Sequence, residues 1–230
     1  KSMLRLFGYL KNHSKGSIRN NLKPMKVSDL PEVKTNWKSL YPGAKEDIPL
    51  KFPTPKGMMM EITSFFDADH AHDQETRRSV TGVILFLMST PVKWYSKRQN
   101  TVESSSFGSE IVAGRITTDI VVEMRYKLRM LGVKVKKCSV VFGDNKSVIL
   151  STSLPSSTLK KKHNAIAYHR IREAVAAGII RMVHVPGVEN IADILTKPLG
   201  PHILYRLIRE LLFNKPPKDL ETDKNTVERD

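Results

Sequence analysis

A short stretch at residues 65–73, "FFDADHAHD", combines three aspartates with two histidines. Carboxylate oxygens are the ligands that Mg²⁺ prefers, and imidazole nitrogens are common ligands of Zn²⁺. The same letters also suit an acidic turn that ends an apolar run. The stretch alone therefore leaves a magnesium site, a zinc site and a plain turn open, and side chains elsewhere in the chain have to decide between them.

The histidines do not find the partners that zinc needs. His70 and His72 are two residues apart, which on a strand places both on one side. Cys138 is the single cysteine of the chain, and no other Cys or His cluster completes a tetrahedral site. His163 and His169 are six residues apart, so they do not share a helix face and are interpreted as surface or packing residues. A zinc site is therefore disfavoured.

Four acids stand where a metal site would need them. Asp67 ends an apolar strand pattern, and Asp144 directly follows the apolar "VVFG". Ligands collect at the carboxyl ends of strands in sheets with crossover helices. Glu110 lies beside the apolar stripe of a long helical pattern, and Asp193 lies within the apolar "NIADIL". A divalent cation shared by these acids would compensate the cost of burying their charges.

Each acid also has a structural explanation. Asp144 could cap the helix that follows it, and Asp193 could pair with a lysine. Taken singly these explanations suffice, but four acids on four elements of one sheet are harder to dismiss. We therefore predict that Asp67, Glu110, Asp144 and Asp193 form a magnesium site.

The elements that must position these acids follow from hydrophobic periodicity and turn residues. Strands are predicted over 58–67, 79–88, 92–96, 139–142 and 179–185, and helices over 104–131, after 145, 163–177, 187–198 and 203–213. The order predicts an α/β fold with a mixed five-stranded sheet, three antiparallel strands followed by parallel ones, and helices on both faces.

The chain divides into five segments by composition. Residues 1–20 carry the end of a helix, 21–57 form a proline-rich connector, and 58–199 contain the ordered block. An amphipathic helix is expected at 200–213 and a disordered charged tail at 214–230. Because residue 1 is a lysine, we expect the chain to be an excised piece of a longer protein.

The charge balance favours a polyanionic partner. The formal net charge is +15, from 38 Lys and Arg against 23 Asp and Glu, and nucleic acid is the commonest polyanion. A basic protein without such a partner is the alternative. No apolar run is long enough for a membrane helix, no signal peptide is evident, and one cysteine suits a reducing compartment. We expect an intracellular protein that is neither secreted nor bound to a membrane.

Several motifs resemble the ribonuclease H domain of copia-type LTR retrotransposon polyproteins. They are "FFDADHAHDQETRRSVTGVILFL", "PVKWYSKRQNTVESSSFGSE", "VVFGDNKSVI", "KKHNAIAYHRIREAV" and "VHVPGVENIADILTKPL". They occur in order over about residues 62–199, and together they form a strong signature. Residues 2–13 resemble the helix that ends the reverse transcriptase in these polyproteins.

The resemblance implies a ribonuclease H-like fold in which Asp67, Glu110, Asp144 and Asp193 hold two Mg²⁺ ions, with Mn²⁺ as a possible substitute. Paired metal ions in such sites lie roughly 4 Å apart. Asp67 would bridge them, with Glu110 and Asp144 on one side and Asp193 on the other. The implied substrate is an RNA–DNA hybrid whose RNA strand is cut to leave a 5′-phosphate and a 3′-hydroxyl. The implied partner is the upstream reverse transcriptase domain, and the implied location is a cytoplasmic virus-like particle or the nucleus.

This chain departs from the family pattern at four positions outside the ligand set: His70, Gly108, Asn164 and Ala167. It also lacks the mobile histidine that cellular relatives carry after the "VP" of the last strand, and His184 is not assigned that role. The departures leave open a domain that binds nucleic acid without cleaving it, or a metal-free basic scaffold protein. The main prediction is a metal-dependent endoribonuclease.

Substrate contacts are predicted from polar and basic residues near the acids. Hydroxyl and amide groups could hold RNA 2′-hydroxyls, and cations could hold the backbone, although a lysine run is also typical of a solvated loop. The predicted contact residues are Ser104, Ser105, Asn145, Lys97, Arg98, Gln99, Lys160, Lys161 and Lys162.

Overall fold

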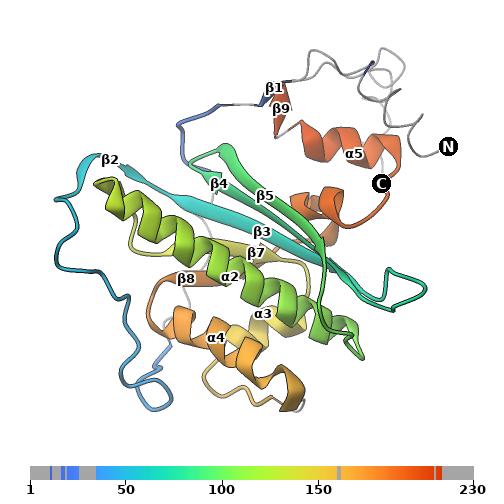
Figure 1. The fold of residues 1–230 in the computed structure, drawn as a ribbon, viewed down its shortest axis with the longest axis horizontal. Helices are drawn as coiled ribbons and strands as arrows, with labels where there is room; N and C mark the ends of the chain where they lie inside the picture. The colour runs from blue at the N-terminus through green and yellow to red at the C-terminus, as the bar shows by residue number, and fades with distance from the viewer. Residues whose placement is uncertain are drawn as a thin grey trace, which may run out of the picture.

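A five-stranded mixed sheet forms the centre of the protein (Figure 1). The computed structural model describes residues 11, 17–18, 20–25, 35–159, 162–209 and 211–213. The strand order is β5-β4-β3-β7-β8. The strands span Ile62–Asp69 (β3), Val80–Leu87 (β4), Thr90–Arg98 (β5), Ser139–Gly143 (β7) and Ile180–His184 (β8). β3, β4 and β5 pair antiparallel, and β7 and β8 add in parallel. The predicted fold class is confirmed.

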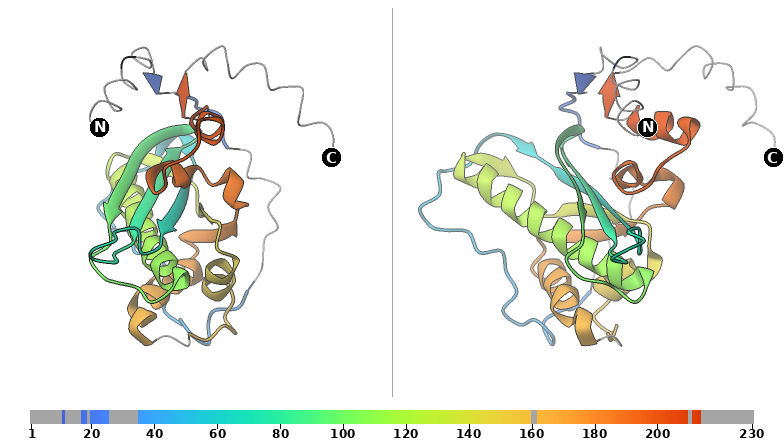
Figure 2. Two further views of the ribbon diagram at one scale, coloured as in Figure 1. Left: turned by 90° about the vertical axis from the view of Figure 1, so that its right-hand side faces the viewer. Right: turned by 45° about the vertical axis from the view of Figure 1, so that its right-hand side comes forward.

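Alternation along β3 divides the core between the two faces of the sheet. Phe66 packs into one hydrophobic cluster and Phe65 into the other, because neighbouring strand residues point to opposite faces. Helix α2 (Ser106–Met130) covers the Phe66 face together with α3 (Lys146–Ser153) and α4 (Ala165–Ala176). Figure 2 shows α2 running along the sheet.

The opposite face is covered by the last part of the chain. A short 3₁₀ turn, Lys162–Asn164 (η1), precedes α4 and β8. Two further 3₁₀ turns come after β8, at Gly187–Glu189 (η2) and Ile191–Leu195 (η3). Helix α5 (Pro201–Ile208) comes next. Ile191 of η3 and Leu207 of α5 pack with Phe65 in the second cluster.

Several elements differ in extent from the predictions. The helix predicted over 203–213 ends at Ile208, and β9 (Leu212–Phe213) pairs antiparallel with β1 (Ser17–Ile18). The predicted strand over 58–67 is two strands, because β2 (Lys56–Met60) pairs separately and in parallel with β6 (Val133–Val135). The predicted helix over 187–198 is present as the 3₁₀ turns η2 and η3.

Part of the predicted connector packs against the sheet domain. Glu46 accepts hydrogen bonds from Arg125 Nε at 2.7 Å and from Arg125 Nη2 at 2.8 Å, and it also pairs with Arg129. The guanidinium of Arg172 lies 4.8 Å from the centre of the Trp37 ring, which is buried. Trp37 thus lies against α4 and Glu46 against α2. The predicted helix over 2–13 and the predicted tail at 214–230 fall outside the described residues, except for Lys11.

Candidate active site

Asp67 and Asp144 are brought together by the pairing of two parallel strands. β3 and β7 align Phe65 with Phe142, so the residues two positions further along, Asp67 and Asp144, lie next to each other. β7 ends at Gly143, which leaves Asp144 at the carboxyl end of its strand. Gly143 leaves room for the Phe66 ring of the neighbouring strand, because an added Cβ at Gly143 would lie 2.5 Å from that ring. The site therefore forms at the edge where sheets of this kind bind ligands.

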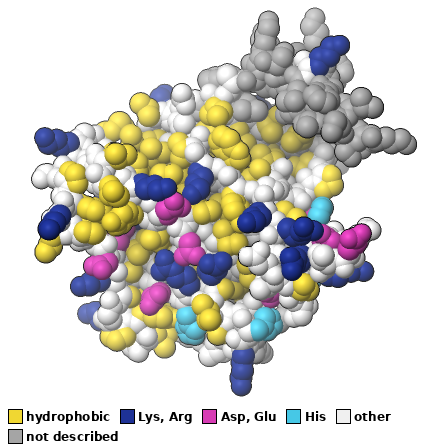
Figure 3. Space-filling view, viewed as in Figure 1, with side chains coloured by type: hydrophobic (Ala, Val, Ile, Leu, Met, Phe, Trp, Pro, Cys, Tyr) yellow, Lys and Arg dark blue, Asp and Glu magenta, His cyan; other side chains and the backbone are white. Residues whose placement is uncertain are grey.

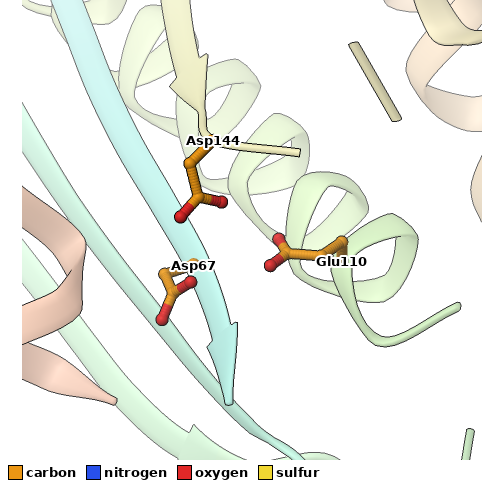
Figure 4. Close-up of side chains that lie close together, drawn as sticks. All are labelled: Asp67, Glu110 and Asp144. Carbon is orange, nitrogen blue, oxygen red and sulfur yellow. The ribbon is translucent and has the colours of Figure 1, made fainter. Parts of the chain in front are cut away.

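Glu110 reaches the two aspartates from helix α2. The helix begins at Ser106 after Ser105, whose hydroxyl accepts from the Gly108 N–H at 3.3 Å and caps the helix. One oxygen each of Asp67, Glu110 and Asp144 lies within 4.8 Å of the others. Figure 4 shows the three carboxylates pointing toward one another from β3, α2 and the end of β7.

Of the three carboxylates, which we call the acidic triad, two are buried and that of Asp144 is half-buried. Asp67 is 1% exposed and Glu110 5%. Glu110 Oε1 accepts from the Ala68 N–H at 3.3 Å, whereas Glu110 Oε2 is buried and has no hydrogen-bond partner among the described residues. An ionised carboxylate in this position costs several kcal/mol unless a cation compensates it.

Burial and the charges of neighbouring acids raise the pKa values of Glu110 and Asp144. The pKa of Glu110 lies well above its usual range, first because of burial and then because of the charges of Asp67 and Asp144. Burial and the Asp67 charge also raise the pKa of Asp144. The raised pKa values of Glu110 and Asp144 show that their charged forms are disfavoured here, and a bound divalent cation would favour those charged forms. The orphaned oxygen of Glu110 and the all-oxygen donor set fit Mg²⁺ or Mn²⁺.

Asp193 lies on the other side of Asp67 and does not join the acidic triad directly. Lys197 Nζ lies 3.1 Å from Asp193 Oδ1 and 3.2 Å from Asp67 Oδ1, so one ammonium connects the two carboxylates. Burial and the Asp67 charge raise the pKa of Asp193 to about 6. The pairing of Asp193 with a lysine, which was one of the structural alternatives, is therefore present.

Three residues that support the site were not predicted from the sequence. Asn190 is buried, donates to the Phe66 carbonyl at 2.9 Å, and hydrogen-bonds to the Asp144 carboxylate. Thr196 donates its hydroxyl to Asp67 Oδ2, and Lys197 holds Asp67 Oδ1. All three residues lie in the motif "VENIADILTKPL", in which Asp193 is the single residue predicted from the sequence to be a metal ligand.

The predicted substrate contacts have mixed surroundings. Ser104 and Lys97 are exposed, and Asn145 caps α3 by accepting from the Val148 N–H at 3.2 Å. Arg98 pairs with Asp73. Gln99 differs from its prediction: it is 3% exposed, and its Nε2 donates inward to Thr81 and to the Ser109 carbonyl.

The remaining predicted contacts are the lysines at 160–162. Lys162 is exposed, and Lys160 and Lys161 fall outside the described residues. On the face seen in Figure 3, Lys and Arg side chains lie interspersed with acidic and hydrophobic ones. Lys97, Arg98 and Arg115 line a hollow of about 310 Å³ between the end of β5, α2 and α4.

The histidines of the opening stretch each contact one nearby polar side chain. His72 Nδ1 lies 2.6 Å from Asp69 Oδ2, and His70 Nδ1 lies 3.4 Å from the Ser109 hydroxyl. His184 Nε2 donates to the Asp144 main-chain carbonyl at 3.1 Å.

Within the described ranges, no cluster of three or more metal-binding side chains occurs apart from the acidic triad. In the same ranges, no helix is both long and apolar enough to cross a membrane.

The sheet has three antiparallel strands followed by two parallel ones, and the acidic triad lies at the carboxyl ends of β3 and β7. This strand order and this position of the acids define a ribonuclease H-like domain. Comparison with known proteins agrees with this class. The chain is 34% identical over 145 residues to the retrovirus-related Pol polyprotein from transposon RE1 of Arabidopsis thaliana, and 32% identical over 162 residues to that from transposon RE2. These matches cover 63% and 70% of the chain. The chain is therefore homologous to a segment of the retrovirus-related Pol polyproteins of plant transposons, which confirms the resemblance seen in its motifs.

The match covers a small part of each relative. The chain spans about a tenth of the length of these curated polyproteins. No family model matches the chain. Among solved structures, the N-terminal ribonuclease H domain of Rv2228c from Mycobacterium tuberculosis has a TM-score of 0.46 at 15% identity, covering 60% of this chain and 91% of that one. LC11-RNase H1 in complex with an RNA/DNA hybrid has a TM-score of 0.47 at 15% identity, covering 59% and 94%.

Proposed function

We propose that this domain is a metal-dependent endoribonuclease that cuts the RNA strand of RNA–DNA hybrids within a reverse transcriptase polyprotein. The observation that carries the proposal is the convergence of Asp67, Glu110 and Asp144 from three separate elements to within 4.8 Å. The homology to transposon Pol polyproteins supports an RNA–DNA hybrid as substrate and a reverse transcriptase as the neighbouring domain. A cytoplasmic virus-like particle or the nucleus is the location that this proposal implies.

The acidic triad would hold a divalent cation, Mg²⁺ or Mn²⁺, through one oxygen of each carboxylate. Asp193 would serve a second ion together with Asp67. When bound, such ions activate a water molecule and stabilise the leaving oxygen in phosphodiester hydrolysis.

The protein's own residues position these groups. Asn190 fixes Asp144 relative to the strand that carries Asp67, because its amide contacts both the Asp144 carboxylate and the Phe66 carbonyl. Thr196 and Lys197 orient the two oxygens of Asp67. The net charge of +15 favours approach of the polyanionic substrate.

The proposal is tested by cleavage of a labelled hybrid. We expect the chain to cut the RNA strand in the presence of Mg²⁺ and to leave 5′-phosphate and 3′-hydroxyl ends. Asp144→Asn removes one negative oxygen from the acidic triad and is expected to lower the rate by 100-fold or more, on the order of 3 kcal/mol. The domain would instead be a nucleic-acid-binding domain if it binds the hybrid but does not cleave it. Its binding would then fall steeply with salt and would not change in Asp144→Asn.

A further inference from the structure

Lys197 places a positive charge at the edge of the acidic triad. Its Nζ contacts both Asp67 Oδ1 and Asp193 Oδ1, at 3.2 and 3.1 Å. Its main-chain N–H donates to the Asp193 carbonyl at 3.0 Å, which fixes Lys197 to the turn that carries Asp193. The ammonium therefore occupies the position between the two carboxylates that a cation on this side would share.

The burial of the three side chains shows from which side Lys197 enters. The side chain of Lys197 is 35% exposed, whereas those of Asp67 and Asp193 are 1% and 14% exposed. Lys197 thus covers the two acids from the solvent side and can move outward without unpacking the core. Burial alone would lower the pKa of Lys197, but the charges of Asp67 and Asp193 outweigh it and raise that pKa.

We propose that Lys197 is a positioning residue that acts as a built-in cation for the Asp67–Asp193 half of the site. The proposal rests on the proposed metal-dependent function. With Lys197 in place, Asp67 and Asp193 stay close despite their like charges, and the acidic triad accepts one divalent ion. A second ion between Asp67 and Asp193 excludes the ammonium, since two cations would need the same oxygens.

The structure also explains why the two halves of the site would fill separately. Glu110 Oε2 has no hydrogen-bond partner among the described residues, so this side of the acidic triad has no cation in contact with it. Asp193, in contrast, already has the Lys197 ammonium at 3.1 Å. The first divalent ion is therefore drawn to the Glu110 side, and the Asp193 side fills only when the Lys197 side chain moves away.

Metal titration of the full chain without nucleic acid tests this proposal. Isothermal titration calorimetry with Mn²⁺ and Mg²⁺ would compare the wild type with Lys197→Met and Lys197→Arg. Lys93→Met is the matched control. Lys93 Nζ lies 2.9 Å from Glu123 Oε2 in a surface ion pair that does not involve the site. We expect one strong site in the wild type, Lys197→Arg and Lys93→Met. In Lys197→Met, a second site should bind at least roughly tenfold more tightly than in the wild type.

Equal stoichiometry and affinity in the wild type and Lys197→Met would overturn the proposal. NMR of the wild-type lysine side chains provides a second measurement should Lys197→Met fail to fold: the Lys197 signal, assigned by its loss in Lys197→Arg, should shift with the second metal equivalent and not with the first. A shift that is complete at the first equivalent, or no shift at all, contradicts the proposal. If the wild type cleaves the hybrid and Lys197→Met binds metal as the wild type does, only the role of Lys197 is disproved. If the wild type binds metal as expected but cleaves no hybrid, only the proposed function is disproved.

Discussion

Asn190 and Phe66 are joined by a hydrogen bond of 2.9 Å from the side-chain amide of Asn190 to the main-chain carbonyl of Phe66. Phe66 directly precedes Asp67, and the same Asn190 side chain contacts Asp144 and caps η3 by accepting from the Ala192 N–H at 3.2 Å. One buried amide therefore connects the strand that carries Asp67, the Asp144 carboxylate and the turn that carries Asp193.

Replacing Asn190 should weaken both stability and metal binding. Asn190→Ala leaves the buried Phe66 carbonyl and the Asp144 carboxylate without this partner, which should lower the free energy of unfolding by about 1–3 kcal/mol. Urea denaturation and metal calorimetry would measure the two effects. Gln74→Ala, a change at an exposed amide side chain, is the control. An Asn190→Ala protein as stable as this control would contradict the bracing role.

Gly82 should tolerate no side chain, because η3 lies against β4. An added Cβ would lie 2.7 Å from Thr196 Cγ2 and 2.9 Å from the Ala192 carbonyl oxygen. Gly82→Ala should destabilise the fold by about 1–3 kcal/mol and displace Thr196 from Asp67. Gly43→Ala, where a Cβ would have no neighbour within 4 Å, is the matched control. Chemical denaturation of both variants tests this difference, and equal stabilities would refute the close approach.

The stability of the metal-free protein should fall as the pH rises from about 4 to 6. Burial and the Asp67 charge raise the pKa of Asp193 from 3.8 to about 6, so the folded chain binds more protons than the unfolded chain in this interval. The Asp193 contribution to the free energy of unfolding therefore decreases with rising pH, and Glu110 and Asp144 add to this trend because burial raises their pKa values too. Glu46 and Glu123, whose pKa values are lowered, act in the opposite direction.

Denaturation at several pH values in a chelator, with Asp193→Asn as the comparison, measures this trend. The stability of Asp193→Asn should decline less with rising pH, because its amide does not titrate. Added Mg²⁺ should restore the stability that the wild type loses by pH 6. Parallel pH profiles of the wild type and Asp193→Asn would show that the Asp193 pKa is not raised.

The contact between the predicted connector and α2 should contribute to folding. Arg125 is fully buried and binds Glu46, the Lys136 and Lys137 carbonyls and the Ser139 hydroxyl. Arg125→Met leaves the two carbonyls and the Ser139 hydroxyl without this donor and Glu46 with Arg129 alone, which should cost about 3 kcal/mol or more. Lys127→Met, which breaks an exposed pair with Glu123, should change stability by less than about 1 kcal/mol. Thermal and urea unfolding of both variants provide the test, and similar losses would contradict the packing.

Much of the fold was predictable because its signals are local. The β-branched run at 79–88 and the apolar stripe at 104–131 give strand and helix directly, and the structure has β4 and α2 there. The site acids were predictable because they interrupt apolar patterns at element ends. Chain order and strand pairing then bring Asp67 and Asp144 together.

The features that escaped prediction depend on contacts distant in the chain. Asn190 and Thr196 gain their roles from residues more than 120 positions away, and nothing in their local sequence separates them from ordinary turn residues. The contact of the predicted connector with α2 depends on Glu46 meeting Arg125, 79 positions further along. The inward turn of Gln99 likewise follows from its contacts with Thr81 and Ser109.

Cleavage of a hybrid by the wild-type chain tests the central claim most directly. A hybrid labelled at the 5′ end of its RNA strand would be incubated with the folded chain in Mg²⁺, in Mn²⁺ and in a chelator, beside RNA and DNA duplexes of the same sequence. The account predicts internal cuts in the RNA strand of the hybrid alone, dependent on the divalent ion and lost in Asp144→Asn. An intact RNA strand at high concentrations of folded protein with either metal would contradict it.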